Sequence, residues 1–175
     1  TPMNGVIGMV ELLLDTSLND EQKEYAVTLR SSAKALLAII NDILDFSKIE
    51  AGELRLELTH FNLLELLDDI VEMFDESCRA KSVELTWFID TKIPVGDLLG
   101  DPLRIKQVLV NLVGNAVKFT HQGSIRIQIS LLGTKNGAYQ IAFEVVDTGI
   151  GIPYEAQSKI FQVFTQADAS TTRKY

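Results

Sequence analysis

A seam of mostly apolar residues between positions 29 and 46 constrains the fold more than any other feature of the sequence. Its members step by three and four in turn, the heptad pattern of a helix that packs along another helix. They are Leu29, Ser32, Leu36, Ile39, Ile43 and Phe46. A second row widens the seam: Ala33, Leu37, Ile40 and Leu44. One partner helix cannot cover so broad a face, so the seam requires a bundle of helices.

The residues before the seam supply the first partner helix. Residues 1 to about 15 carry apolar side chains on one side: Val6, Met9, Val10, Leu13 and Leu14. Asn19, with Gln22 three residues later, resembles a capping box that opens a second helix reaching about Ile49. Two helices on a short loop form a hairpin, and a hairpin with this face needs another hairpin. We therefore expect a homodimeric four-helix bundle; the alternative is that the face packs on the following domain.

The rest of the chain alternates between strand and helix patterns. We predict a strand at 54–58, a helix at 61–80 after a brief entry strand, a strand at 83–89, a helix at 101–120, and a hairpin of strands 124–132 and 138–147. Helices on one side of a mixed, largely antiparallel sheet make an α/β sandwich. The sequence thus predicts an α+β chain with a helical hairpin at 1–56 and an α/β domain at 57–175.

The predicted helix at 101–120 has two different faces. Asp101 is a good N-cap, and Pro102 fits the first helical position because its missing N–H costs nothing there. One apolar face is formed by Ile105, Leu109, Leu112, Ala116 and Phe119. A neighbouring stripe is polar: Arg104, Gln107, Asn111, Asn115 and Lys118.

The polar stripe of this helix has two interpretations. Asparagine is unfavourable inside helices because its side chain competes for backbone hydrogen bonds. Asn111 and Asn115 nevertheless lie four residues apart on one face, and Lys118 follows three residues later. The stripe is either a solvated surface or a ligand site, with amide oxygens for Mg²⁺ and an ammonium for phosphate.

A glycine-containing turn supports the ligand site. The letters DTGIGIP, beginning at Asp147, directly follow the last predicted strand. Glycine lets the backbone approach a ligand closely, and an aspartate at a strand end can accept a hydrogen bond from an amino group. By itself the motif is typical of many turns. Together with the asparagine and lysine stripe, it indicates a site for a purine nucleotide and Mg²⁺.

Composition excludes several classes of function. The net charge of −8 over 175 residues argues against a general nucleic-acid or anionic-membrane surface. A single cysteine, Cys78, allows no internal disulfide, and its helical context predicts a small buried side chain. No apolar run approaches the roughly 18–20 residues that cross a bilayer.

Four motifs in order resemble those of sensor histidine kinases. The letters NLVGNAVKFT from Asn111 resemble the N box, DTGIGIP from Asp147 the G1 box, and FQVFTQAD from Phe161 the F box. Upstream, TPMNGVIGM from Thr1 is similar to the tail of the H box, and DFSKIEAG from Asp45 to the end of its second helix. The sequences of these motifs are most similar to those of hybrid kinases that regulate bacterial adaptation and virulence. The resemblance implies a dimerisation and phosphotransfer hairpin followed by an ATP-binding domain of the GHKL superfamily.

The resemblance also implies roles for individual residues. Asn115 would be the Mg²⁺ ligand with Asn111 beside it, Lys118 would contact phosphate, and Asp147 would hold the adenine amino group. Thr1 would be one turn from the phosphoacceptor histidine and a candidate for a phosphatase activity; its other interpretation is an ordinary residue before Pro2. Further nucleotide-site residues are implied in and after the G1 box: Gly149 and Gly151 as a lid hinge, Ile152 beside the nucleotide, and Phe161 and Phe164 as anchors of the lid. From the residues alone, the two phenylalanines could equally be plain core.

Two elements of the family pattern are expected outside the sequence. The phosphoacceptor histidine belongs four residues before Thr1, and the glycine-rich G2 box belongs after Tyr175. His60 and His121 do not match the phosphoacceptor position and are expected at the surface. We therefore expect a fragment that is inactive alone, from the cytoplasmic part of a kinase anchored in the inner membrane by other segments.

The implied function is ATP-dependent phosphorylation of a histidine, followed by transfer to an aspartate of a receiver domain. The expected cofactors are ATP and Mg²⁺, and the expected partners are a second copy of the chain and a receiver domain. Two alternatives remain at this point. One is a kinase-dead signalling module of the same fold, and the other is a different GHKL ATPase, such as a chaperone or topoisomerase subunit.

Overall fold

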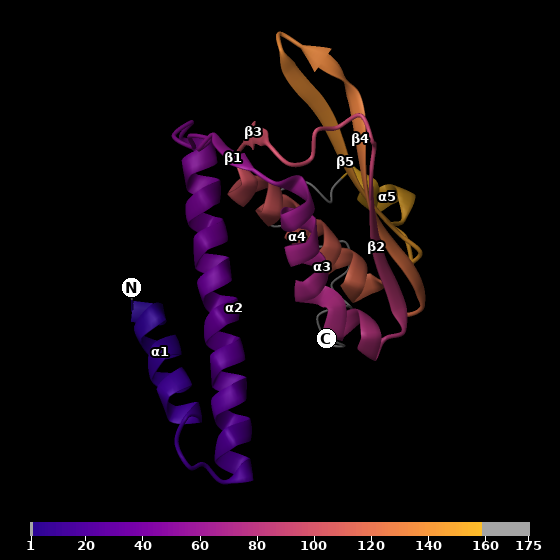
Figure 1. The fold of residues 1–175 in the computed structure, drawn as a ribbon. Helices are drawn as coiled ribbons and strands as arrows, with labels where there is room; N and C mark the ends of the chain where they lie inside the picture. The colour runs from indigo at the N-terminus through magenta and orange to yellow at the C-terminus, as the bar shows by residue number, and fades with distance from the viewer. Residues whose placement is uncertain (1, 159–175) are drawn as a thin grey trace. The chain divides into compact units, whose positions relative to one another are not determined.

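The chain divides into a helical unit that ends at Arg55 and a mixed α/β unit that begins at Leu56. The computed structural model describes residues 2–158. The helical unit consists of α1 (Pro2–Leu14) and the long helix α2 (Asp20–Glu50), as Figure 1 shows. At the start of α2, Asn19 Oδ1 accepts the backbone N–H of Gln22 at 2.8 Å, and the Asn19 N–H donates to Gln22 Oε1 at 3.1 Å. The predicted capping box is therefore confirmed, and it fixes the end of the loop between the helices.

The two helices contact each other through a narrow line of small side chains. Val10 of α1 and Ala26 and Ala33 of α2 are buried. Most of the predicted seam lies on another side of α2, where the apolar side chains are 48–55% exposed: Leu29, Leu36, Ile39 and Ile43. The hairpin alone therefore leaves a broad apolar face in water, a costly arrangement for a monomer.

The second unit contains eight described elements. In chain order they are β1 (Thr59–Phe61), α3 (Leu63–Ala80), β2 (Val83–Ile89), β3 (Leu98–Gly100), α4 (Pro102–Phe119), β4 (Gly123–Lys135), β5 (Ala138–Asp147) and α5 (Tyr154–Gln157). Strands β2, β4 and β5 form one sheet with β4 in the centre, parallel to β2 and antiparallel to β5. Helices α3 and α4 lie on the same side of this sheet (Figure 1). The predicted α+β class and mixed sheet are confirmed.

The central strand β4 supplies the middle of the core. Ile125, Ile127 and Ile129 alternate along it and are completely buried, as the two-residue period of a strand requires. They belong to the same apolar cluster as Ile70 of α3 and Val113 of α4. Each fully buried side chain of this size stabilises the fold by roughly 1.5–3 kcal/mol. Residues of α4 between Ile105 and Val117 pack into this cluster and hold the helix against the rest of the unit.

The buried face of α4 overlaps the predicted one, since Leu109 and Ala116 are buried as expected, but it is rotated from it. Val113 and Val117 are also buried, whereas Leu112, a member of the predicted apolar face, is 37% exposed. The cause is that α4 carries apolar residues on more than half of its circumference, so several stripes have helical spacing. Packing against α3 and β4 selects the stripe that contains Val113. Cys78 is buried as predicted, and this burial raises the pKa of its thiol.

The predicted strand at 54–58 is wrong. Residues 54–58 have no strand partner. The first strand, β1, begins at Thr59 and pairs with β3, a strand that was not predicted from the sequence. The backbone N–H of Glu57 instead donates to Asp101 Oδ2 at 3.0 Å. Asp101 Oδ1 accepts the N–H of Arg104 at 3.1 Å, which confirms the predicted N-cap of α4. One carboxylate therefore joins the segment before β1 to the start of α4.

This double use of Asp101 predicts a pH dependence of stability. The N–H groups of Glu57 and Arg104 lower the pKa of the Asp101 carboxyl below its ordinary value of about 3.9. The stabilisation is therefore present above about pH 4 and is lost as the pH falls through the lowered pKa. Asp101→Asn should lower the free energy of unfolding at neutral pH and lose less stability on acidification, measured by urea unfolding between pH 2 and 7. Equal acid sensitivity of both proteins would contradict this.

Candidate functional site

The polar stripe of α4 faces away from the core. Asn111, Asn115 and Lys118 are exposed, and at about 100° per residue they lie on the side of the helix opposite Val113. The Lys118 ammonium lies 5.2 Å from the centre of the Phe119 ring. Burial of the opposite face thus presents two amides and a cation together on an accessible surface.

The G1-like turn is anchored to the start of β4. The N–H of Thr148 donates to the carbonyl of Ser124 at 3.1 Å, and Thr148 Oγ1 accepts the N–H of Ser124 at 3.0 Å. Asp147, at the end of β5, pairs with Ile125 in the sheet register. The turn that follows the strand is therefore fixed by both backbone and side-chain bonds.

The Asp147 side chain is held by its own turn. Its Oδ1 accepts the backbone N–H of Gly149 at 2.8 Å. A carboxylate has two acceptor oxygens, so this bond leaves Asp147 able to accept a further N–H from a ligand. Asp147 is exposed at the end of the strand, so a ligand can reach its carboxylate from solvent.

Gly149 and Gly151 serve different purposes. A Cβ at Gly149 would lie 2.6 Å from the carbonyl oxygen of Phe119 and 2.8 Å from Asp147 Oδ1, so only glycine fits without displacing one of them. Gly151 has open space around it but φ of +69°, a conformation that other residues adopt at a cost. Ile152 follows with its side chain about half exposed. Close approach explains the first glycine, and backbone conformation explains the second.

The structure brings the end of α4 to the G1 turn. The N–H of Ile150 donates to the carbonyl of Phe119 at 3.4 Å, and Gly149 lies against the same carbonyl. Lys118 and Asn115 occupy the turn of α4 that ends there. Residues separated by about 30 positions in the sequence, Asn115 and Lys118 on one side and Asp147 and Gly149 on the other, therefore belong to neighbouring parts of one surface.

This donor set fits a nucleotide with Mg²⁺. Within residues 2–158 there is no group of three or more His, Cys, Asp or Glu side chains that could hold a metal ion. Any Mg²⁺ there would depend on the asparagine amides, on phosphate oxygens and on water, which is the mode in which Mg²⁺ commonly binds phosphate substrates. Thr1, Phe161 and Phe164 lie outside the described residues.

The histidines of the described chain lie at the surface, as predicted. His60 and His121 are exposed, and His60 Nδ1 lies 2.6 Å from Asp97 Oδ1. None of the helices within the described range is long and apolar enough to cross a membrane.

Sequence reasoning missed two residues that support this surface. Thr148 holds the G1 turn, and its position beside Asp147 was a usable signal because threonine hydroxyls commonly bond nearby backbone. Lys81, just after α3, donates to carbonyls at the end of α4. No local pattern indicates a contact between residues 36 positions apart.

Comparison with known families divides the chain in the same order. Residues 1–52 match the model described as the His Kinase A (phospho-acceptor) domain. Residues 100–175 match the model described as the histidine kinase-, DNA gyrase B- and HSP90-like ATPase. The phospho-acceptor match distinguishes this chain from ATPases that have only the second domain.

Individual proteins agree with the family models. Over all its 175 residues the chain is 48% identical to the signal transduction histidine-protein kinase BarA of Escherichia coli, of which it covers 19%. The chain therefore spans about a fifth of the length of this curated relative. The structure of full-length ShkA in complex with AMPPNP superposes with a TM-score of 0.75 at 36% identity, covering 95% of this chain and 35% of ShkA.

A third protein, the histidine kinase ThkA, extends the comparison. Its complex with the response regulator protein TrrA gives a TM-score of 0.60 at 28% identity, over 94% of this chain and 47% of ThkA. The catalytic domain of ThkA alone is 33% identical with a TM-score of 0.55, over 65% of this chain and 71% of that domain. The two family models, the relatives and the superposed structures agree: this chain belongs to the signal-transduction histidine kinases, with a phospho-acceptor-type hairpin followed by a GHKL-type ATPase domain.

Proposed function

We propose that the chain is the catalytic core of a sensor histidine kinase that uses ATP and Mg²⁺. The kinase would phosphorylate a histidine four residues before Thr1 and pass the phosphoryl group to an aspartate of a receiver domain. The observation that carries this proposal is the meeting of the Asp147–Gly149 turn with the end of α4, where Asn115 and Lys118 are exposed. The ShkA complex with AMPPNP, an ATP analogue, supports nucleotide binding.

Each proposed site residue has a chemical task. Asp147 accepts a hydrogen bond from the adenine amino group, while the turn around Gly149 admits the base closely. Asn115, with Asn111 beside it, binds Mg²⁺ through amide oxygens, and Lys118 binds phosphate. Gly151 allows the backbone after the turn to change direction, Ile152 lies beside the nucleotide, and Phe161 and Phe164 anchor the segment that closes over it.

The proposed transfer moves one phosphoryl group. The bond between the γ-phosphorus and its bridging oxygen breaks, a phosphorus–nitrogen bond to the histidine forms, and ADP leaves. When bound, Mg²⁺ neutralises charge on the phosphate oxygens. Lys118 adds a fixed positive charge near the C-terminus of α4. This charge stabilises the negative charge that develops on the oxygen of the leaving ADP.

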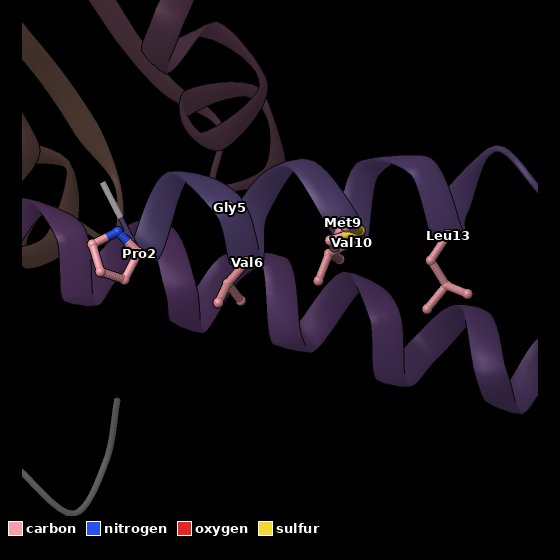
Figure 2. A pocket seen from close by; sticks show the side chains of 6 residues that line it. All are labelled: Pro2, Gly5, Val6, Met9, Val10 and Leu13. Atoms are coloured by element: carbon pink, nitrogen blue, oxygen red, sulfur yellow. The ribbon is translucent and has the colours of Figure 1, made fainter.

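The hairpin unit supports a homodimer. An apolar groove runs along α1 and is lined by Pro2, Gly5, Val6, Met9, Val10 and Leu13; Figure 2 shows these residues following one side of the helix. Together with the exposed seam of α2 it offers two apolar strips to a second hairpin. We therefore propose that two copies form a four-helix bundle.

The ThkA complex with TrrA supports a receiver domain as the other partner. The parent kinase is proposed to be an inner-membrane receptor with this chain on its cytoplasmic side.

The experiment that tests the kinase proposal is autophosphorylation of the full-length protein with γ-labelled ATP and Mg²⁺. We expect label that is stable to base and released by acid, as for a phosphorus–nitrogen bond. Lys118→Met should lower the rate at least about tenfold, because it removes a cation from the developing phosphate charge. Label that survives acid and is that of a serine or threonine phosphate ester, or an unchanged rate in Lys118→Met, would contradict the proposal.

Thr1 carries a second proposed activity in the same protein. A hydroxyl one helical turn from the phosphoacceptor histidine can orient water towards a phosphorylated receiver. Thr1→Ala should therefore slow dephosphorylation of the receiver while leaving autophosphorylation largely intact. Parallel loss of both activities, or loss of neither, would reduce Thr1 to an ordinary residue before Pro2.

A further inference from the structure

The C-terminal end of α4 receives hydrogen bonds from both backbone and side-chain donors. The last four carbonyls of a helix have no partner within the helix and carry its partial negative charge. In α4 they belong to Ala116, Val117, Lys118 and Phe119. The first accepts the N–H of Thr120 at 2.9 Å, and the last accepts the N–H of Ile150 at 3.4 Å. These two carbonyls are therefore satisfied by backbone.

The two carbonyls between them are served by one side chain. Lys81 Nζ donates to the carbonyl of Val117 at 2.7 Å and lies 3.4 Å from that of Lys118. Lys81 follows α3 directly, as its C-cap residue. Its ammonium thus joins the end of α3 to the end of α4, on the turn that carries Lys118.

This contact matters because of where the proposed phosphates lie. Anions bind favourably at helix N-termini and unfavourably at C-termini, where the helix dipole is negative. Asn115 and Lys118 are near the C-terminus of α4, so a polyphosphate bound by them meets the unfavourable end. Lys81 places a positive charge directly on those carbonyls and offsets the repulsion.

We propose that Lys81 is a positioning residue of the nucleotide site: it fixes the last turn of α4 and makes that turn electrostatically acceptable to phosphate. The inference rests on the proposed function and adds to it. Lys81 acts through the backbone of Lys118 and does not itself touch the nucleotide.

The chain offers a matched control for this role. Lys106 Nζ also links α4 to α3, through Asp69 Oδ2 at 2.7 Å, but it does so near the start of α4. Lys81→Met and Lys106→Met therefore each remove one ammonium contact between the same two helices. Lys81→Arg keeps the charge and can donate to the same carbonyls.

The test compares magnesium ADP with adenosine in the full-length protein by calorimetry. Lys81→Met should weaken magnesium ADP by about tenfold and leave adenosine unchanged, because only the phosphates meet the end of the helix. Lys81→Arg should restore most of the affinity, and Lys106→Met should not alter it. Hydrogen exchange without nucleotide should show a faster Thr120 amide in Lys81→Met only.

Three results would overturn the proposal. Unchanged binding of magnesium ADP in Lys81→Met would show that the ammonium is irrelevant to the site. Equal loss for ADP and adenosine, together with a lower melting temperature, would show a role only in stability. If the unsubstituted protein binds neither ligand, the proposed function itself fails. The first two results differ from this one because in both the unsubstituted protein binds magnesium ADP.

Discussion

Asp147→Asn is expected to weaken binding of magnesium ADP by about 1–3 kcal/mol, the usual effect of losing a charged hydrogen bond. The Gly149 N–H already orients the carboxylate at 2.8 Å, so the aspartate is held in place before a ligand arrives. An amide at this position presents an oxygen without charge or an N–H that repels the adenine amino group. Calorimetry on the full-length protein measures the effect.

The adenine assignment has a direct control. Inosine diphosphate has no amino group on the base, so the unsubstituted protein should prefer ADP, and Asp147→Asn should lose that preference. Asp75→Asn, at a half-buried aspartate of α3 paired with Arg79, should change neither affinity. Identical ADP affinities for the unsubstituted protein and Asp147→Asn would exclude this role of Asp147.

The two glycines of the same turn extend the test. A methyl group at Gly149 would press on both Asp147 Oδ1 and the Phe119 carbonyl, so Gly149→Ala should reduce nucleotide affinity at least as much as Asp147→Asn. A Cβ at Gly151 would meet no other part of the protein within 4 Å, so the substitution to alanine acts only through φ of +69°. Gly151→Ala should therefore cost roughly 1 kcal/mol of stability and have a smaller effect on binding.

The second large effect is expected at the hairpin. Ile43→Asp should dissociate the proposed dimer or unfold the helices, because it places an unpaired charge in the exposed seam of α2 at a cost on the order of several kcal/mol. Light scattering at tens of micromolar measures the mass, and circular dichroism measures the helix content.

A charge elsewhere on α2 supplies the control. Ala38 is exposed on a different side of the helix from the seam, so Ala38→Asp should leave a dimer. If the unsubstituted protein is monomeric at these concentrations, the four-helix bundle proposal is wrong and the seam must have another cover. Dissociation by both aspartates would show that the helix, not the seam, is sensitive to charge.

Local signals in the sequence were sufficient to place most of the secondary structure. The Asn19–Gln22 capping box, the Asp101–Pro102 start of α4 and the alternation of Ile125, Ile127 and Ile129 all act within one helical turn or one strand. Such short-range preferences do not depend on the rest of the chain, so the secondary structure they favour can be predicted from the sequence alone. The order of motifs placed the candidate site residues on α4 and on the turn after β5.

The sequence determined which residues carry the candidate chemistry, but only the tertiary structure decided how they are held. It selected Val113 over Leu112 for the core, because both lie on apolar stripes of α4 and only packing on α3 and β4 chooses between them. It gave the Glu57 N–H to Asp101 in place of a strand, and it brought Lys81 to the end of α4. These contacts join residues 36 to 44 positions apart. Which residues form these contacts depends on how whole helices and strands pack around the shared core. The local spacing of residues in the sequence does not predict that packing.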